Sequence, residues 1–107
     1  TRFTMEQDFY KGRLASRHGI DAVVPDAHGR DIVHRIIYEE LVRGVVKAKS
    51  KIEYEHLVAS MRREHETDSL IMGCTEITML IGQADFDIPV FDTTDIHAQA
   101  AVEFALD

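Results

Sequence analysis

The chain contains a single cysteine, relatively few basic residues and no long apolar run, and each shortage excludes a class of protein. One cysteine cannot form an internal disulfide, so we expect a fold that does not depend on oxidation and a cytoplasmic location. No apolar stretch approaches the ~20 residues that a membrane-spanning helix needs. With 12 basic against 19 acidic residues, the net charge of −7 opposes binding to nucleic acid or to anionic membranes.

Metal-binding patterns are also missing. Six histidines are present, but no two of them lie four residues apart, and only one cysteine is available, so we expect no metal site. What the chain does have is 107 residues with 45% apolar content, enough for one domain with a single core. It begins at Thr1 without an initiator methionine, and we expect that a segment upstream of Thr1 has been removed.

Apolar periodicity predicts several helices. The first is expected over residues 5–18, with Thr4 as its N-cap and Gly19 as its C-terminal stop. Between residues 25 and 31 a polar turn containing His28 and Gly29 is expected. The other predicted helices cover residues 32–45, 50–61, 77–81 and 96–105, the last of them capped by Asp95 with its apolar residues facing inward.

Three short β-prone runs, at residues 21–24, 69–72 and 88–92, alternate with these helices. Strands that alternate with helices favour right-handed crossovers and a parallel sheet covered on both faces. The predicted fold is therefore a three-layer α/β/α domain with a short parallel sheet, spanning residues 1–107. In such sheets ligands bind at the carboxyl ends of the strands.

The segment from Leu70 to Ile77 is the most informative for chemistry, because it places the lone Cys74 between a predicted strand and a predicted helix. A helix N-terminus favours an anion, so the thiol pKa is expected to fall below its ordinary value of about 8.5. Thr75 offers a hydroxyl and an N–H to a carboxylate, and Glu76 lies in the first turn. Alternatively, Cys74 is a small packing residue and Glu76 only marks the start of a helix.

These residues belong to motifs that resemble the aspartate/glutamate racemases, which are cofactor-independent amino-acid racemases. The similarity to that family extends from the first motif to the last, in the family's order. The motifs are TRFTM at 1–5, IYEEL at 37–41, GCTEI at 73–77, PVFDTT at 89–94 and IHA at 96–98.

The resemblance implies two pseudo-symmetric α/β lobes with the active site between them, of which this chain is the C-terminal lobe. Helix 95–106 is then expected to pack toward the absent N-terminal lobe. Cys74 would be one of two acid/base residues, with the other in the absent lobe, and no pyridoxal phosphate or other cofactor would be needed. The implied substrate-binding residues are Thr1, Thr4, Thr75 and Glu76, although Thr4 could serve only as an N-cap and Thr1 as a frayed end.

The isolated chain is accordingly expected to be inactive and to dimerise or self-associate through its exposed interlobe face. The partner expected for catalysis is a small-molecule substrate, an amino acid such as aspartate or glutamate. Aspartate-specific relatives have a lysine after the Ile-Tyr-Glu segment, where this chain has Val42 and Arg43, so a broad or altered specificity is expected. Two alternatives are a related two-lobe isomerase or decarboxylase of the maleate isomerase or arylmalonate decarboxylase type, and a non-catalytic binding or assembly module.

Overall fold

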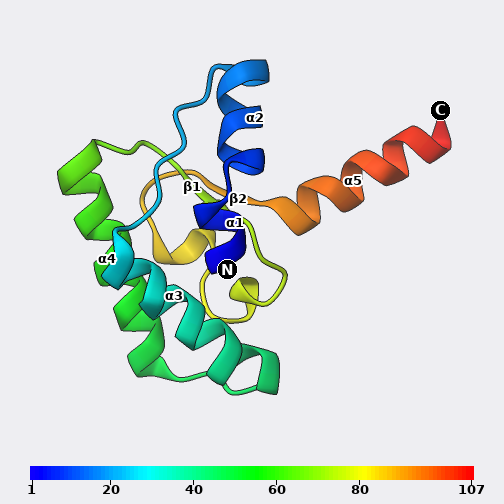
Figure 1. Cartoon of the computed structure of the whole chain (residues 1–107). Coiled ribbons are helices and arrows are strands. Elements are labelled where there is room, and N and C mark those ends of the chain that lie inside the picture. The colour runs from blue at the N-terminus through cyan, green and yellow to red at the C-terminus, as the bar shows by residue number, and fades with distance from the viewer.

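The computed structural model describes all 107 residues and has a mixed α/β fold with a short parallel sheet, as predicted. Figure 1 shows helices packed around the strands, while the C-terminal helix projects away from the body. The elements are α1 (Arg2–Glu6), α2 (Asp8–His18), α3 (Ala27–Glu39), η1 (Leu41–Arg43), α4 (Ala48–His65), β1 (Leu70–Met72), η2 (Ile77–Met79), η3 (Gln83–Asp85), β2 (Val90–Asp92) and α5 (Thr93–Leu106).

The sheet consists of β1 and β2, which pair in parallel with Met72 opposite Asp92. Both strands lie within ranges predicted from the sequence. Because they are parallel and in this register, the residues that follow them, Gly73 and Thr93, emerge at the same edge of the sheet. This edge is where the sequence placed the candidate site.

The predicted strand at residues 21–24 is wrong, because these residues have no regular secondary structure and Val23 remains 36% exposed. A strand needs a neighbour to pair its backbone N–H and C=O groups, and neither β1 nor β2 pairs with this segment. Its β-prone composition therefore has no sheet to join within this chain.

The predicted turn at His28 and Gly29 is also wrong, because α3 already begins at Ala27. Asp26 is the N-cap and its carboxylate accepts a hydrogen bond from the Gly29 N–H at 2.9 Å. A glycine is needed here: a Cβ at position 29 would lie only 2.6 Å from Cβ of the rigid Pro25 ring and 2.8 Å from Leu57 Cδ1 of α4. The glycine thus permits close packing of two helices.

The first predicted helix is split into two. Gln7 is extended, with a ψ of 143°, so α1 ends at Glu6 and α2 begins at Asp8. Thr4 lies inside α1, and the N-cap is Thr1, so the prediction that Thr4 caps the helix is wrong. Gly19 ends α2 in the left-handed conformation, with a φ of 64°, as predicted. After this break, α1 packs against α3 as well as against α2.

The core lies between α3, α4 and the sheet. Its largest fully buried side chains are Ile36, Ile37 and Leu41, and Tyr54 of α4 packs beside them and donates a hydrogen bond to the Val33 carbonyl at 3.1 Å. The predicted helix 32–45 ends early because α3 gives way to η1, and Gly44, with a φ of 75°, turns the chain. The rest of the core comprises Met72, Leu80 and Ile81.

A buried carboxylate joins α3 to α4. Glu40 accepts a hydrogen bond from the Ser50 hydroxyl, and Arg35 Nη1 lies 3.5 Å from Glu40 Oε2. The two partners satisfy a charged group that would be costly to bury alone. This pair fixes the end of α3 against the start of α4.

Helix α5 differs from the prediction in its cap and in its burial. Asp92, rather than Asp95, is the N-cap and accepts hydrogen bonds from the Thr94 and Asp95 N–H groups at 3.0 and 3.3 Å. None of the residues of α5 is buried, and Phe104 is 86% exposed. The apolar residues predicted to face inward are instead exposed because no other element covers the helix: Ile96, Ala100, Val102 and Leu106. No helix of the chain is both long and apolar enough to cross a membrane.

Candidate active site at the carboxyl edge of the sheet

The two strand ends are tied together at the edge where Gly73 and Cys74 lie. The Thr93 hydroxyl, directly after β2, donates a hydrogen bond to the Met72 carbonyl of β1 at 2.8 Å. Sequence analysis did not select Thr93 as a site residue, although its place directly after a predicted strand was a usable signal. The bond holds the segment that follows β1 beside the start of α5.

Helix α1 brings Thr4 to the same edge. The Thr4 methyl Cγ2 would lie 3.9 Å from a Cβ built on Gly73, which is ordinary van der Waals distance. Thr4, predicted from the first motif, therefore lies next to the residue that precedes Cys74. Thr1 is one turn earlier, where it is the N-cap of α1 and its carbonyl accepts from the Met5 N–H at 3.1 Å. Its side chain makes no capping hydrogen bond.

The Cys74 thiol, the Thr75 hydroxyl and the Glu76 carboxylate form a compact cluster. Cys74 Sγ lies 3.2 Å from Glu76 Oε2 and donates to it, and Thr75 Oγ1 donates to the same oxygen at 2.7 Å. Cys74 is half-buried and packs against the core. Three of the predicted site residues are thus in direct contact, and a single carboxylate oxygen accepts hydrogen bonds from two of them.

The surroundings of Cys74 raise the pKa of its thiol. Burial is the largest cause, and the Glu76 carboxylate adds to it by accepting the thiol proton and by its charge. The backbone N–H groups of Glu76 and Ile77 act in the opposite direction, because they favour the thiolate. The same contacts lower the pKa of Glu76, first through Thr75 and then through Cys74.

The predicted decrease in the thiol pKa is therefore wrong. It relied on an α-helix beginning just after Cys74, whereas the structure has only the three-residue 3-10 turn η2, with Glu76 as its N-cap. So short a turn provides little of the aligned dipole that a longer helix would offer to a thiolate. The thiol is consequently held in its protonated form.

Tyr54 is a second titratable group near the thiol. Burial raises the pKa of its phenol, and the negative charge of the Cys74 thiolate adds to the increase. This proximity could not be predicted from sequence, because Tyr54 lies on α4, far from Cys74 along the chain. The phenol donates its proton to the Val33 carbonyl, which commits it to a structural contact.

Replacing Glu76 with glutamine should lower the pKa of Cys74, because the amide retains an acceptor but removes the negative charge that disfavours the thiolate. The pH dependence of alkylation by iodoacetamide measures this pKa. The midpoint for Glu76→Gln is expected below that of the unsubstituted chain. Glu103→Gln, on the exposed α5, is the control and should leave the midpoint unchanged. An unchanged or higher midpoint in Glu76→Gln would show that Glu76 does not control the thiol.

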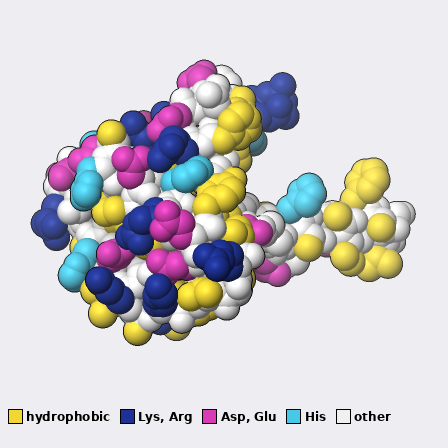
Figure 2. All heavy atoms as spheres, turned by 60° about the horizontal axis from the view of Figure 1, so that its bottom comes forward, with side chains coloured by type: hydrophobic (Ala, Val, Ile, Leu, Met, Phe, Trp, Pro, Cys, Tyr) yellow, Lys and Arg dark blue, Asp and Glu magenta, His cyan; other side chains and the backbone are white.

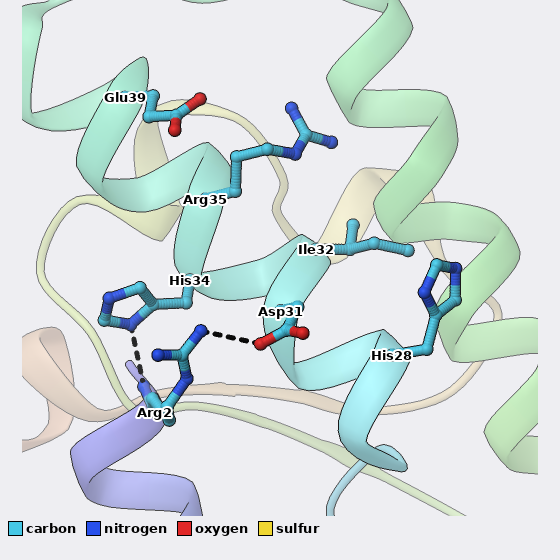
Figure 3. A pocket seen from close by; sticks show the side chains of 7 residues that line it. All are labelled: Arg2, His28, Asp31, Ile32, His34, Arg35 and Glu39. Carbon is cyan, nitrogen blue, oxygen red and sulfur yellow. Dashed lines mark hydrogen bonds and ion pairs between the residues drawn. The ribbon is translucent and has the colours of Figure 1, made fainter.

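A separate open groove, with a volume of about 340 Å³, lies between α1 and α3. Figure 3 shows Arg2 of α1 pointing toward Asp31 and His34, whereas His28 points away from Arg2. The groove is lined by charged and imidazole side chains and contains none of the cysteine cluster. Its residues are Arg2, His28, Asp31, Ile32, His34, Arg35 and Glu39.

The remaining histidines do not gather at the candidate site. His97 lies on the exposed surface of α5. No group of three histidine, cysteine, aspartate or glutamate side chains is arranged to hold a metal ion. The groups at the carboxyl edge are a thiol, hydroxyl groups, a carboxylate and backbone N–H groups.

The chain is similar to proteins of one family in both sequence and structure. The family model for Asp/Glu/hydantoin racemase matches residues 1–101. A crystal structure of a putative Asp/Glu racemase from Yersinia pestis superposes with a TM-score of 0.92 and 47% sequence identity. The match covers 100% of this chain and 46% of the Yersinia pestis protein. The structure of an aspartate racemase homologue from Pyrococcus horikoshii OT3 gives a TM-score of 0.90 at 34% identity, with the same coverage. The chain thus spans about half the length of these two proteins.

Proposed function

Because the chain belongs to the Asp/Glu/hydantoin racemase family, we propose that it forms one half of an enzyme that racemises an amino acid without a cofactor. The observation that carries this proposal is the position of the Cys74 thiol at the shared carboxyl edge of β1 and β2, with Thr4 alongside Gly73. This edge is where parallel sheets bind their ligands.

Racemisation requires two proton-transfer groups on opposite faces of the α-carbon, because one removes the weakly acidic hydrogen while the other delivers a proton. Cys74 is proposed as one of them. Its raised pKa suits it to the role of donor: the S–H bond breaks, the α-carbon gains the proton, and sulfur keeps the electron pair. The opposite group removes the original α-hydrogen. In the reverse direction the Cys74 thiolate takes the proton back.

The surroundings of the thiol support both halves of this cycle. While Cys74 is protonated, the Glu76 carboxylate orients its S–H bond at 3.2 Å. When the thiolate forms, the Glu76 and Ile77 N–H groups stabilise it. The opposite acid/base residue is proposed to lie in the second half of the enzyme, so the isolated chain should be inactive.

The substrate is proposed to bind through its charged α-substituents. Thr4 and Thr1 provide hydroxyl groups for the carboxylate, and Thr75 provides its backbone N–H, because its hydroxyl donates to Glu76. The negative charge of Glu76 suits the ammonium group. Arg43, the cation nearest in sequence to the position where aspartate-specific relatives carry a lysine, is exposed at the end of η1. We therefore propose a broad or altered preference within the aspartate and glutamate class.

Exchange of the substrate α-hydrogen with solvent deuterium tests this proposal directly. The protein containing both halves should catalyse exchange for at least one of L- and D-aspartate, L- and D-glutamate or a wider set of amino acids. Exchange is the better readout, because it detects proton removal even when the opposite enantiomer does not accumulate. No exchange with any amino acid, together with turnover of maleate or an arylmalonate, would contradict racemisation and favour a related isomerase or decarboxylase.

We further propose that α5 packs against the second half of the enzyme, and that it mediates self-association when that half is absent. Figure 2 shows hydrophobic side chains over the outer end of the projecting arm, with more of them where the body faces it. A helix with apolar residues on all sides is usually buried. Its most exposed apolar residues are Val102, Phe104 and Leu106.

Sedimentation velocity at increasing concentration is expected to show that the isolated chain forms dimers or larger species. Phe104→Glu should shift it toward monomer, because the carboxylate would be buried without a partner in the interface. Val46→Glu places a carboxylate at another exposed apolar position, distant in sequence, and should leave association intact. A monomeric chain at all concentrations, or equal effects of the two substitutions, would argue against association through α5.

A further inference from the structure

Helix α1 depends on α3 for its position. It has only five residues, too few to be stable alone, and its N-cap Thr1 makes no side-chain capping bond. Instead, the backbone N–H of Arg2 donates a hydrogen bond to Nδ1 of His34 at 3.2 Å. An N–H in the first turn of a helix has no partner within the helix. The imidazole of α3 therefore supplies an acceptor that α1 lacks.

Ion pairs also join these helices, but they lie at the surface. Arg2 Nη2 is 2.6 Å from Asp31 Oδ1, and Arg30 Nε is 3.1 Å from Glu6 Oε2. Exposed pairs of this kind contribute little to stability and are screened by salt. His34 is less exposed, and its ring stacks on Tyr38 with the centroids 4.5 Å apart. The ion pairs need ionised carboxylates, which change charge only at lower pH, whereas the contact to His34 depends on an imidazole, the side chain that ordinarily titrates nearest neutral pH.

We propose that neutral His34 is a positioning residue that holds α1, and with it Thr4, against Gly73. The inference rests on the proposed function only in assigning Thr4 to substrate binding, since the position of α1 can be measured without substrate. To accept from Arg2, the imidazole must carry its single proton on Nε2. The contact can exist only while the ring is neutral.

Protonation of His34 should release α1. An added proton on Nδ1 would face the Arg2 N–H, and the new positive charge would lie beside the Arg2 guanidinium. Histidine is the side chain whose charge ordinarily changes between about pH 5 and 8, so the docking of α1 should be followed across this range. The carboxylates nearby offset part of the repulsion without replacing the lost acceptor. The titratable and charged groups of both helices around the ring are Arg2, Glu6, His28, Arg30, Asp31, Arg35, Tyr38 and Glu39.

The nuclear Overhauser effect between the Thr4 methyl group and the Gly73 α-protons reports the docking of α1 in the full chain. It is expected to be strong at pH 8 and to weaken as His34 titrates, with the midpoint followed on the ring proton of His34 itself. The loss of one hydrogen bond should reduce the ratio of docked to undocked α1 about fivefold.

Two substitutions separate the role of the acceptor from that of the ring. His34→Asn places a carbonyl oxygen where Nδ1 lies and cannot titrate, so the Overhauser effect should persist at low pH. In His34→Gln the carbonyl lies one bond further along the side chain, so the contact should be weak at every pH. His28→Asn, in the same groove but turned away from Arg2, is the control and should behave like the unsubstituted chain.

The inference is overturned if the contact between Thr4 and Gly73 in the unsubstituted chain does not change with pH, or if His34→Gln keeps it. It is also overturned if His34→Asn loses the contact at low pH as the unsubstituted chain does. None of these measurements involves turnover, so failure of the racemase proposal would leave them interpretable.

Discussion

Replacing Cys74 with alanine in the protein that contains both halves is expected to slow α-hydrogen exchange by about a thousand-fold, the usual contribution of a positioned acid/base group. The reason is that the α-carbon would lose the proton donor on one of its two faces. Exchange should be measured from each enantiomer separately, because removal of one of two bases affects the two directions unequally. The enantiomer whose α-hydrogen faces Cys74 should lose the most.

The substitution tests chemistry more than folding. Cys74 is only half-buried, and alanine removes a single sulfur atom from the site. Met79→Ala, at an exposed position in the adjacent turn η2, is the matched control and should retain exchange. If Cys74→Ala exchanged at the unsubstituted rate from both enantiomers, Cys74 would be a packing residue and the proposed mechanism would be wrong.

Replacing Ile36 with alanine is expected to lower the free energy of unfolding by about 3–4 kcal/mol, within the usual range for buried isoleucine. Ile36 is 0% exposed and belongs to the cluster that joins α3, α4 and the sheet. Since domains of this size are stable by only about 5–15 kcal/mol, the loss is a large share of the total. The shift of the urea midpoint measures it.

Ile52→Ala provides the comparison for this prediction. Ile52 lies on α4 but is 51% exposed, so the same truncation removes little buried surface. Its midpoint should change much less than that of Ile36→Ala. Equal losses at the two positions would show that the burial of Ile36 does not determine the stability of this core.

Local patterns were sufficient to predict the strands that enter the sheet and the helices that form the core. β1 and β2 are short apolar runs next to Gly73 and Pro89, and the periodicity of Ile32 and Ile36 placed them on the inner face of α3. The segment 21–24 has a similar composition but is not a strand. Composition alone does not show whether a neighbouring strand is available for pairing.

The candidate site was predicted in part. The motif at residues 73–77 located Cys74, Thr75 and Glu76, which the structure brings into contact. The direction in which the pKa of the Cys74 thiol shifts was not predictable, because it depends on burial and on the orientation of the Glu76 carboxylate. The bond from Thr93 to Met72 joins residues 21 positions apart and follows only from the register of the two strands.

The absence of a loop between β2 and α5 has a mechanical consequence. The strand ends at Asp92, the helix begins at Thr93, and the Asp92 carboxylate caps the first turn of that helix. Without flexible residues at this junction, the direction of α5 is set by the sheet. One residue inserted there would rotate every side chain of α5 by about 100° around its axis. The junction therefore fixes the orientation of α5, so that any domain bound to α5 would be oriented relative to the edge of the sheet that carries Cys74.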